Sequence, residues 1–420
     1  MTIFLKSVKV VDSGSPHHGK IVDIRLADGA IAAIGDLEPS ENDQVVAQDG
    51  LCISPGWIDL HVDFADPGEE EREDIESGVA AAIAGGFTGA VLMPSTNPVV
   101  DSKSQVEYVR KKAEHLPFYL YPAGALSRQL SGDELAEMYD MHRAGARCFT
   151  DDVKSNLKAD FITLALEYVQ QFDAPVFIMS QEPSMVKGGQ MHEGEVSTKL
   201  GLKGMPSAAE VMQVERDIQL LRYAGGHLHF MGISTAGAVE AIARAKDEGL
   251  QVTADVNIAN LVLNDERLVD YDADYKYYPP LRTEQDRLAL IDGLRKGIID
   301  AVSSDHRPQF EETKKCEFSL ASFGSIGLES CFGLLGKTGL SLEERVDVLS
   351  KMPRIILNLP ELVVDEGQSA QFTLFLPDEA WIFNKAHIQS KSKNTPFIGE
   401  TLIGKAYGVI VDDTLVTINK

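Results

Sequence analysis

The sequence predicts an α/β fold, a (β/α)8 TIM barrel with a small β-sandwich domain built from both ends of the chain. Three observations support this prediction. The first ~50 residues consist of short apolar runs joined by tight turns, and the last ~55 residues have the same texture. Between them, short apolar runs alternate with segments of helical periodicity. We therefore expect a small β domain at 1–54 plus 365–420 and a barrel at 55–364.

Both terminal segments show the alternation and turn residues of antiparallel strands. Residues 2–11 alternate between apolar and polar side chains, and 21–26 lead through Asp28-Gly29 into the next apolar run. An Asp-Gly pair between two such runs favours a hairpin, since glycine adopts positive φ without steric cost. Near the C-terminus, strands are expected at 371–376, 380–383 and 408–418. Strands from the two ends would pair into one domain.

The middle of the chain repeats a strand followed by a helix. Three helix starts carry capping-box patterns, at Ser131 with Glu134, Ser207 with Glu210 and Thr283 with Asp286. The repeats predict a barrel, although a doubly wound sheet would give the same alternation. The segment 188–202, rich in glycine, is expected to be a mobile loop. The strands are expected at 57–61, 89–93, 118–122, 147–150, 175–180, 227–231, 251–256 and 299–304.

Composition and charge narrow the class of function. The 420 residues include 39 Lys and Arg against 64 Asp and Glu, a net charge of −25. Such an anion repels phosphate backbones and anionic lipids, which argues against nucleic-acid and membrane partners. No apolar run approaches the roughly 20 residues that span a bilayer, and no signal-peptide pattern opens the chain. The four cysteines lack metal or disulfide spacing. We expect a cytoplasmic protein.

Polar side chains gather where the barrel strands should end. In a barrel, the carboxyl ends of the strands form the functional face, so these residues should converge. The strand-end residues whose side chains could bind a metal or take part in catalysis are Asp59, His61, Asp63, Ser95, Asp151, Asp152, Glu182, Asp255 and Asp305.

Six segments at these positions resemble motifs of dihydroorotases in the amidohydrolase superfamily, of the type with Asp in place of carboxylated Lys. PGWIDLH at 55–61 resembles PGxxDxHxH, and MPSTNP at 93–98 resembles MPNTxP. The others are DPG at 66–68, CFTDD at 148–152, YPPLR at 278–282 and SDHRP at 304–308. The resemblance covers essentially the whole chain. It implies the amidohydrolase barrel, a zinc pair and hydrolysis of a cyclic amide.

The chain departs from the family at several metal ligands. By the resemblance, Asp63 replaces the second histidine of HxH, and Ser180 and Gly232 replace two later histidines. The remaining candidate or vestigial metal positions are His61, Asp63, Asp151, Asp152 and Asp305.

This donor set argues against a binuclear zinc centre. His61 and Asp63 lie two apart on a strand, so their side chains share a face and could share one metal. One imidazole among carboxylates suits a single Mg²⁺ or Mn²⁺ better than zinc. We therefore expect either no metal or one divalent ion. Arg307 stands where the family has alanine, and we expect its cation to neutralise Asp305 or Asp63 in the metal's place.

The substrate contacts implied by the resemblance are altered as well. By position they fall on Ser95, Asn97, Tyr278 and Gln309, and several of these side chains differ from the family's. Ala65 stands where the family has an arginine that holds the substrate carboxylate. Alanine cannot supply that bidentate contact.

Three functional hypotheses follow. The first is a dihydroorotase-like protein of pyrimidine biosynthesis that has lost catalysis and is a structural partner of aspartate transcarbamoylase, a role that the resemblance implies for ligand-deficient members. The alternative is an active cyclic amide hydrolase that converts dihydroorotate to carbamoyl aspartate with a reduced metal site and Asp305 as general base. The third is a small-molecule binding module in the old pocket, with Tyr278 and Arg307 forming its floor. A homo-oligomer is expected in each case.

Overall fold

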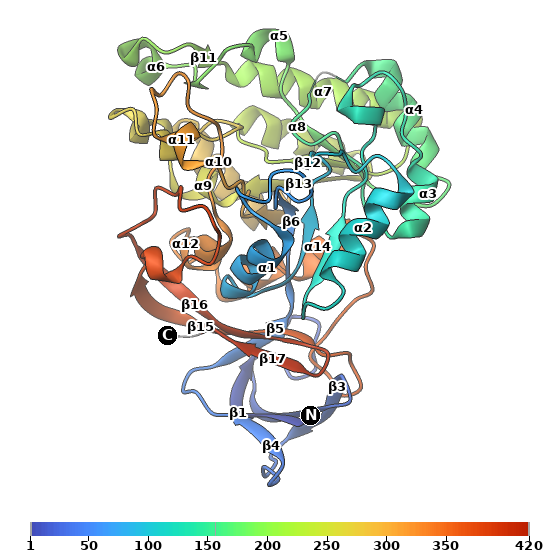
Figure 1. Cartoon of the computed structure of the whole chain (residues 1–420), viewed down its shortest axis with the longest axis vertical. Coiled ribbons are helices and arrows are strands. Elements are labelled where there is room, and N and C mark those ends of the chain that lie inside the picture. The colour runs from blue at the N-terminus through green and yellow to red at the C-terminus, as the bar shows by residue number, and fades with distance from the viewer. Residues whose placement is uncertain (1, 156, 419–420) are drawn as a thin grey trace.

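The computed structural model describes residues 2–155 and 157–418. Figure 1 shows a helix-rich body above and a β domain below, with both chain ends at the β domain. The two ends meet because N-terminal and C-terminal strands share one sheet, in the order β17-β16-β15-β5-β1-β2-β3 with β4 paired to β1. The bounds of these strands are β1 (Thr2–Val10), β2 (Ile21–Ala27), β3 (Ala30–Gly35), β4 (Asp43–Val46), β5 (Cys52–Pro55), β15 (Gln371–Ile382), β16 (Thr401–Val411) and β17 (Thr414–Thr417).

The helix-rich body is a closed barrel of parallel strands. Strands β6-β7-β8 form one run and β9-β12-β13-β14 another. Parallel bridges from Gly124 to Phe149 and from Phe149 to Val176 join the two runs on one side. A bridge from Val62 to His306 joins them on the other side. The bounds are β6 (Trp57–Val62), β7 (Phe87–Leu92), β8 (Tyr119–Pro122), β9 (Val176–Met179), β12 (Leu228–Met231), β13 (Val252–Asn257) and β14 (Ala301–Ser303).

Helices surround the barrel strands and follow them along the chain. The longer helices are α1 (Ile75–Ala84), α2 (Lys103–Ala113), α4 (Ala159–Val169), α7 (Ser207–Ala224), α8 (Ala236–Asp247) and α10 (Glu284–Arg295). The shorter ones are α3 (Met138–Ala144), α5 (Pro183–Val186), α6 (Glu195–Leu200), α9 (Ile258–Val262), α11 (Glu311–Lys314), α12 (Cys331–Leu335), α13 (Leu342–Asp347) and α14 (Lys351–Ile356). No helix among the described residues is long and apolar enough to cross a membrane.

Four local predictions meet different outcomes. The expected strand at 147–150 is reduced to single bridges at Phe149, which pairs on both sides but too briefly to form a ladder. The segment 188–202 is folded. It contains β10 (Met191–His192) and α6, and β10 pairs with β11 (Gly204–Met205), which follows α6. The cap at Thr283 is confirmed, because its hydroxyl accepts a hydrogen bond from the Asp286 backbone. Ser207 does not cap α7, whose N-cap is Pro206.

The third predicted cap, at Ser131, is also wrong. The next α-helix along the chain, α3, begins only at Met138, with Glu137 at its N-cap position. Ser131 instead accepts a hydrogen bond from the backbone of Asp133. A local turn has therefore taken the place of the expected helix start.

Candidate functional site

A buried histidine lies at the carboxyl end of β6. His61 Nε2 lies 2.9 Å and 3.0 Å from the two carboxylate oxygens of Asp255 on β13, and its Nδ1 lies 3.1 Å from Ser303 Oγ. Burial opposes the charged form of His61, but the carboxylates of Asp255 and Asp305 together outweigh it and raise the pKa of His61 to about 10. Both ring nitrogens are therefore engaged by the protein.

Asp255 connects two histidines at the centre of the barrel. Its carboxylate also lies 2.8 Å from His229 Nε2 and accepts a hydrogen bond from the Gly232 backbone at 2.8 Å. Although burial opposes ionisation, His61 and the hydrogen bonds hold the pKa of Asp255 well below its usual range. The sequence places Asp255 at a strand end, but no motif indicates that it binds both histidines.

A guanidinium lies between two of the predicted metal-site carboxylates. Arg307 Nε donates to Asp305 Oδ1 at 2.8 Å, and its two terminal nitrogens donate to Asp152 at 2.6 Å and 3.1 Å. Asp152 and Asp305 are each only 1% exposed at the side chain. Burial would raise the pKa of Asp152, but Arg307 keeps it below the usual value. Of the two partners predicted for Arg307, Asp305 is confirmed and Asp63 is not, and Asp152 is a further partner.

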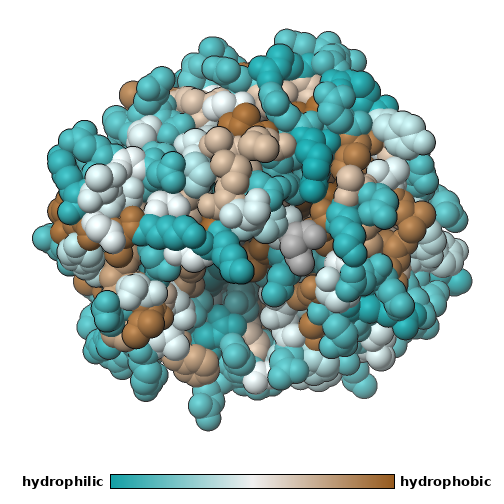
Figure 2. All heavy atoms as spheres, turned by 90° about the horizontal axis from the view of Figure 1, so that it is seen from above, coloured by the Kyte–Doolittle hydropathy of each residue, from teal (hydrophilic) through white to brown (hydrophobic). Residues whose placement is uncertain are grey.

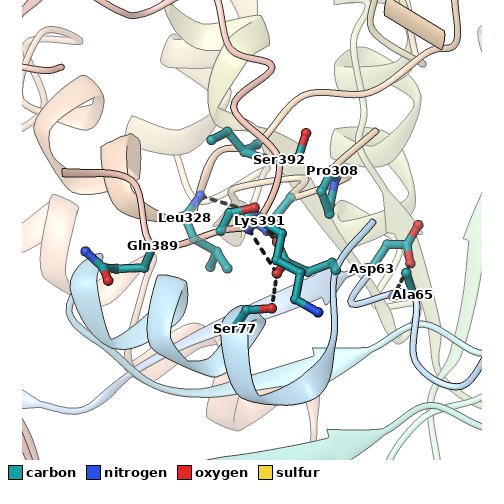
Figure 3. Close-up of polar contacts among 12 residues, drawn as sticks. Asp63, Ala65, Ser77, Pro308, Leu328, Gln389, Lys391 and Ser392 are labelled. Carbon is teal, nitrogen blue, oxygen red and sulfur yellow. Dashed lines mark hydrogen bonds and ion pairs between the residues drawn. The ribbon is translucent and has the colours of Figure 1, made fainter. Parts of the chain in front are cut away.

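Asp63 has a different cation. Arg72 Nη1 donates to Asp63 Oδ2 at 2.8 Å and to the backbone oxygen of Pro308 at 2.6 Å. The backbone of Ala65 donates to the other Asp63 oxygen at 2.9 Å, and Figure 3 shows Asp63 and Ala65 side by side. Asp63 is thus held by Arg72, and the structure does not bring it to His61 as a second ligand of one ion. Arg72 lies outside every motif used for the sequence prediction.

The structure separates the roles of the two adjacent aspartates that the sequence leaves open. Asp151 accepts hydrogen bonds from the backbones of Leu126 and Ser127 at 2.9 Å and from the Ser127 hydroxyl, which fixes the loop after β8. Asp152 faces Arg307 and also accepts from Ser95 Oγ at 2.5 Å. Asp152 is therefore the site-facing residue, and Asp151 is structural.

A second buried polar cluster supports the segment after β14. His306 Nε2 lies 3.6 Å from Glu73, and the backbone of Leu328 donates to His306 Nδ1 at 3.5 Å. Ser77 and the backbone of Lys391 donate to Glu73 (Figure 3). This cluster ties the strand-end segment to α1 and to the C-terminal segment near Ser392.

The four positions predicted for substrate contact have varied surroundings. Ser95 is committed to Asp152, and Asn97 is exposed. Tyr278 is half-buried and packs edge-to-face on Phe323, with ring centroids 5.7 Å apart. The Gln309 backbone donates to Asn394 Oδ1 at 3.1 Å. Figure 2, which views this end of the molecule from above, shows a mainly hydrophilic surface with scattered hydrophobic patches.

These residues do not fit the zinc pair that the family resemblance implies. A catalytic zinc needs about three protein ligands and one open position. Here every ligand candidate is already bound by other protein groups, and within 2–155 and 157–418 no group of three or more His, Cys, Asp or Glu could hold a metal ion. The guanidinium of Arg307 touches the two carboxylates that would have to bind the ion.

Comparisons with known proteins place this geometry in a family. The family model described as "Dihydro-orotase-like" matches residues 50–238. A protein of Syntrophotalea carbinolica named dihydroorotase is 38% identical and covers 98% of both chains. The Bacillus subtilis dihydroorotase is also 38% identical, over 91% of each chain.

Solved structures agree on the fold. The L-hydantoinase (dihydropyrimidinase) of Arthrobacter aurescens superposes with a TM-score of 0.87 at 22% identity, covering 99% of this chain and 96% of that one. The dihydropyrimidinase of Brevibacillus agri gives 0.84 at 21% identity, with 100% and 96% coverage. The predicted barrel with a β domain is thereby confirmed. The 38% identity to dihydroorotases over nearly the whole chain, together with this fold, shows that the chain belongs to the dihydroorotase family of the amidohydrolase superfamily.

Proposed function

We propose that the chain is a dihydroorotase-like protein of pyrimidine biosynthesis whose ancestral metal centre has been replaced by a salt-bridge network, so that metal-dependent hydrolysis is lost. The observation that carries this proposal is the contact of Arg307 with both Asp152 and Asp305. A guanidinium neutralises the carboxylates as a metal would, but it offers no coordination position for water and does not lower the pKa of one.

The remaining residues give hydrolysis little support. Asp305, the general base of the enzyme hypothesis, is bound by Arg307 and accepts a further hydrogen bond from Asn257 at 3.1 Å. Its carboxylate is thus engaged on both oxygens. Loss of a charged partner in a buried binding site costs on the order of 2–5 kcal/mol, and Ala65 offers a substrate carboxylate no charge at all.

The names of the relatives favour the alternative, and they support it better than the non-catalytic hypothesis. Proteins named dihydroorotase match this chain at 38% identity over nearly its full length. The second candidate function is therefore an active cyclic amide hydrolase, which would have to open the network around Arg307 before it bound a metal ion.

One experiment separates the two candidates. The protein is purified without chelator and supplied with Zn²⁺ or Mn²⁺. Bound metal is then measured, together with the hydrolysis of dihydroorotate and its formation from carbamoyl aspartate. The Bacillus subtilis dihydroorotase is the positive control. We expect no stoichiometric metal and no turnover above the protein-free rate. Turnover that Asp305→Asn abolishes would instead establish the enzyme and refute the proposal.

We further propose aspartate transcarbamoylase as the partner of the non-catalytic protein. The support is the family membership combined with the network described above. Co-purification of the transcarbamoylase from the same organism, together with its activity and oligomer size with and without this chain, tests the role. Failure of the two proteins to associate would eliminate this partner and leave the question of catalysis untouched.

A further inference from the structure

A cavity of about 880 Å³ lies at the opposite end of the barrel from the candidate site. Its walls are the end of α2, the end of α3, the start of β8 and the turn after β16. In Figure 1, α2 lies above the β16–β17 hairpin on the right of the view. Because barrel catalysis uses the carboxyl ends of the strands, this cavity is separate from the site described above. Its volume is within the range of small-molecule pockets.

The cavity has an aromatic wall. Tyr119 and Tyr121 are two apart on β8, so both side chains point to the same face of the strand. Their rings lie nearly parallel, with an interplanar angle of 12° and centroids 6.4 Å apart. Both are half-buried, and each lines the cavity. Aromatic side chains that line a cavity are a surface on which a planar aromatic ligand can stack.

The cavity also has cations that the protein does not neutralise. Arg143 and Arg147 line it and are exposed, and no carboxylate in the described part of the chain lies within ion-pair distance of either. The charge of Arg147 acts on His142, because burial and this guanidinium together lower the pKa of His142. The guanidinium groups of Arg143 and Arg147 can therefore bind an anion in the cavity without first breaking an ion pair.

A third guanidinium is held in a fixed position in the wall. Arg110 Nη1 donates to the backbone oxygen of Ala144 at 2.7 Å. Its side chain lies across Gly145, where a Cβ atom would come within 2.7 Å of Arg110 Cδ. Gly145 has a φ of +120°, which glycine tolerates. Two of the three carboxylates that line the cavity have partners of their own. Glu107 faces Lys103, and Asp412 accepts a hydrogen bond from Tyr119.

We propose that this cavity binds a nucleoside monophosphate, with the base on Tyr119 and Tyr121 and the phosphate on Arg143 and Arg147. Guanidinium groups bind phosphate through paired hydrogen bonds, and every base offers a face for stacking. A mononucleotide fits better than a nucleic acid, because a chain of this net charge repels a polyanion. Glu114 on the rim adds to that repulsion.

Calorimetric titration with uridine and adenosine monophosphate tests the site, with uridine and inorganic phosphate as separate probes. We expect a Kd below about 1 mM for a nucleotide and at least tenfold weaker binding of uridine and of phosphate. The double variant Arg143→Gln/Arg147→Gln should weaken nucleotide binding at least tenfold. Arg244→Gln, an exposed arginine paired with Glu215 outside the cavity, should leave it unchanged.

Thermal melting without ligand verifies that both variants are folded. No binding at about 5 mM nucleotide would overturn the proposal. Undiminished binding by the double variant would do the same, and so would phosphate binding as tight as that of the nucleotide. None of these results bears on metal binding or hydrolysis, so this proposal stands or fails independently of the proposed function.

Discussion

Four residues at the strand ends have an unusual backbone conformation. Ala65, Asp152, Asp305 and Gly232 all have φ between +48° and +59°. A left-handed conformation costs a residue with a side chain on the order of 1–3 kcal/mol, and such residues gather at functional sites. The backbone is therefore shaped for a site that points residues into the barrel mouth. Arg307, beside Asp305, now fills the space between the carboxylates.

Arg307 should be essential to stability. Arg307→Gln would leave Asp152 buried without its cation and Asp305 with His61 alone, and breaking a buried pair from one side costs about 3–5 kcal/mol. We expect urea denaturation to show a loss of that size in the free energy of unfolding. Arg244→Gln, which breaks only an exposed pair, should cost no more than about 1 kcal/mol. A loss at Arg307 as small as the one at Arg244 would contradict the network.

The sequence predicts which residues lie at this site better than it predicts which of them contact one another. His61, Asp152 and Asp305 could be placed at the barrel mouth because strand ends converge. Arg72 could not be foreseen as the partner of Asp63, because it reaches back from the loop before α1 and belongs to no motif. The sequence identified Asp255 only as one of several carboxylates at strand ends and did not predict its contacts with His61 and His229. Which carboxylate meets which cation depends on side-chain packing across strands that are distant in sequence.

At the scale of the elements, two buried lysines hold the long segment that follows β14. Lys276 Nζ donates to the backbone oxygens of Phe318 and Ala321 at 2.6 Å and 2.7 Å. Lys314 Nζ donates to those of Ser322 and Gly324 at 3.1 Å and 2.9 Å. Lys276 also lies 5.0 Å from the ring centroid of Phe318. The segment, poor in regular structure, is thus ordered by lysines that bind its carbonyl groups.

This arrangement predicts a pH dependence. Burial lowers the pKa of Lys276 to about 8, below its ordinary value of 10.5. At pH values between about 8 and 10.5, Lys276 is protonated in the unfolded chain but not in the folded one. The free energy of unfolding therefore increases as pH rises through this range. From pH 7 to 10, the wild type should gain up to about 3 kcal/mol in free energy of unfolding relative to Lys276→Met. Urea denaturation across that range measures the difference.

Lys314 is present in both proteins, but the charge of Lys276 helps to lower the pKa of Lys314, so the difference between the two proteins includes this coupling. Lys158→Met, at an exposed lysine, serves as the matched control and should show no such trend. A difference between wild type and Lys276→Met that stays constant with pH would show that Lys276 has an ordinary pKa.

Hydrophobic periodicity predicted the elements well where they are long and poorly where they are short. The strand pattern at 147–150 is real, but only Phe149 pairs, because the chain turns at once into the loops on either side. At 188–202 the glycines suggested mobility, whereas β10 pairs with β11 beyond α6. The contacts that order such segments come from elsewhere in the chain, so no local window contains them.

At the scale of the whole molecule, the barrel and the terminal sheet share one core. Trp57, at the start of β6, is fully buried, and its ring lies 4.5 Å from Phe332 and 5.3 Å from Phe375 of β15, between centroids. Polar contacts cross the same boundary, since the Trp57 backbone donates to Thr373 Oγ1 and Thr373 donates to the backbone of Gly86. Neither part can lose the other without exposing this aromatic cluster, so we expect them to unfold together.

Trp57→Ala tests this coupling, and the variant carries its own reporter. Removing a fully buried tryptophan should lower the free energy of unfolding by about 3–5 kcal/mol. The chain has two tryptophans, so in the variant Trp381 of β15 is the only tryptophan and its fluorescence follows the terminal sheet, while far-ultraviolet circular dichroism follows the helices of the barrel. The two signals should change at the same, lowered urea concentration. Trp381→Phe, at a half-buried site, is the control and should cost much less. If the sheet signal instead kept the wild-type midpoint while the barrel signal moved, the two parts would be independent folding units.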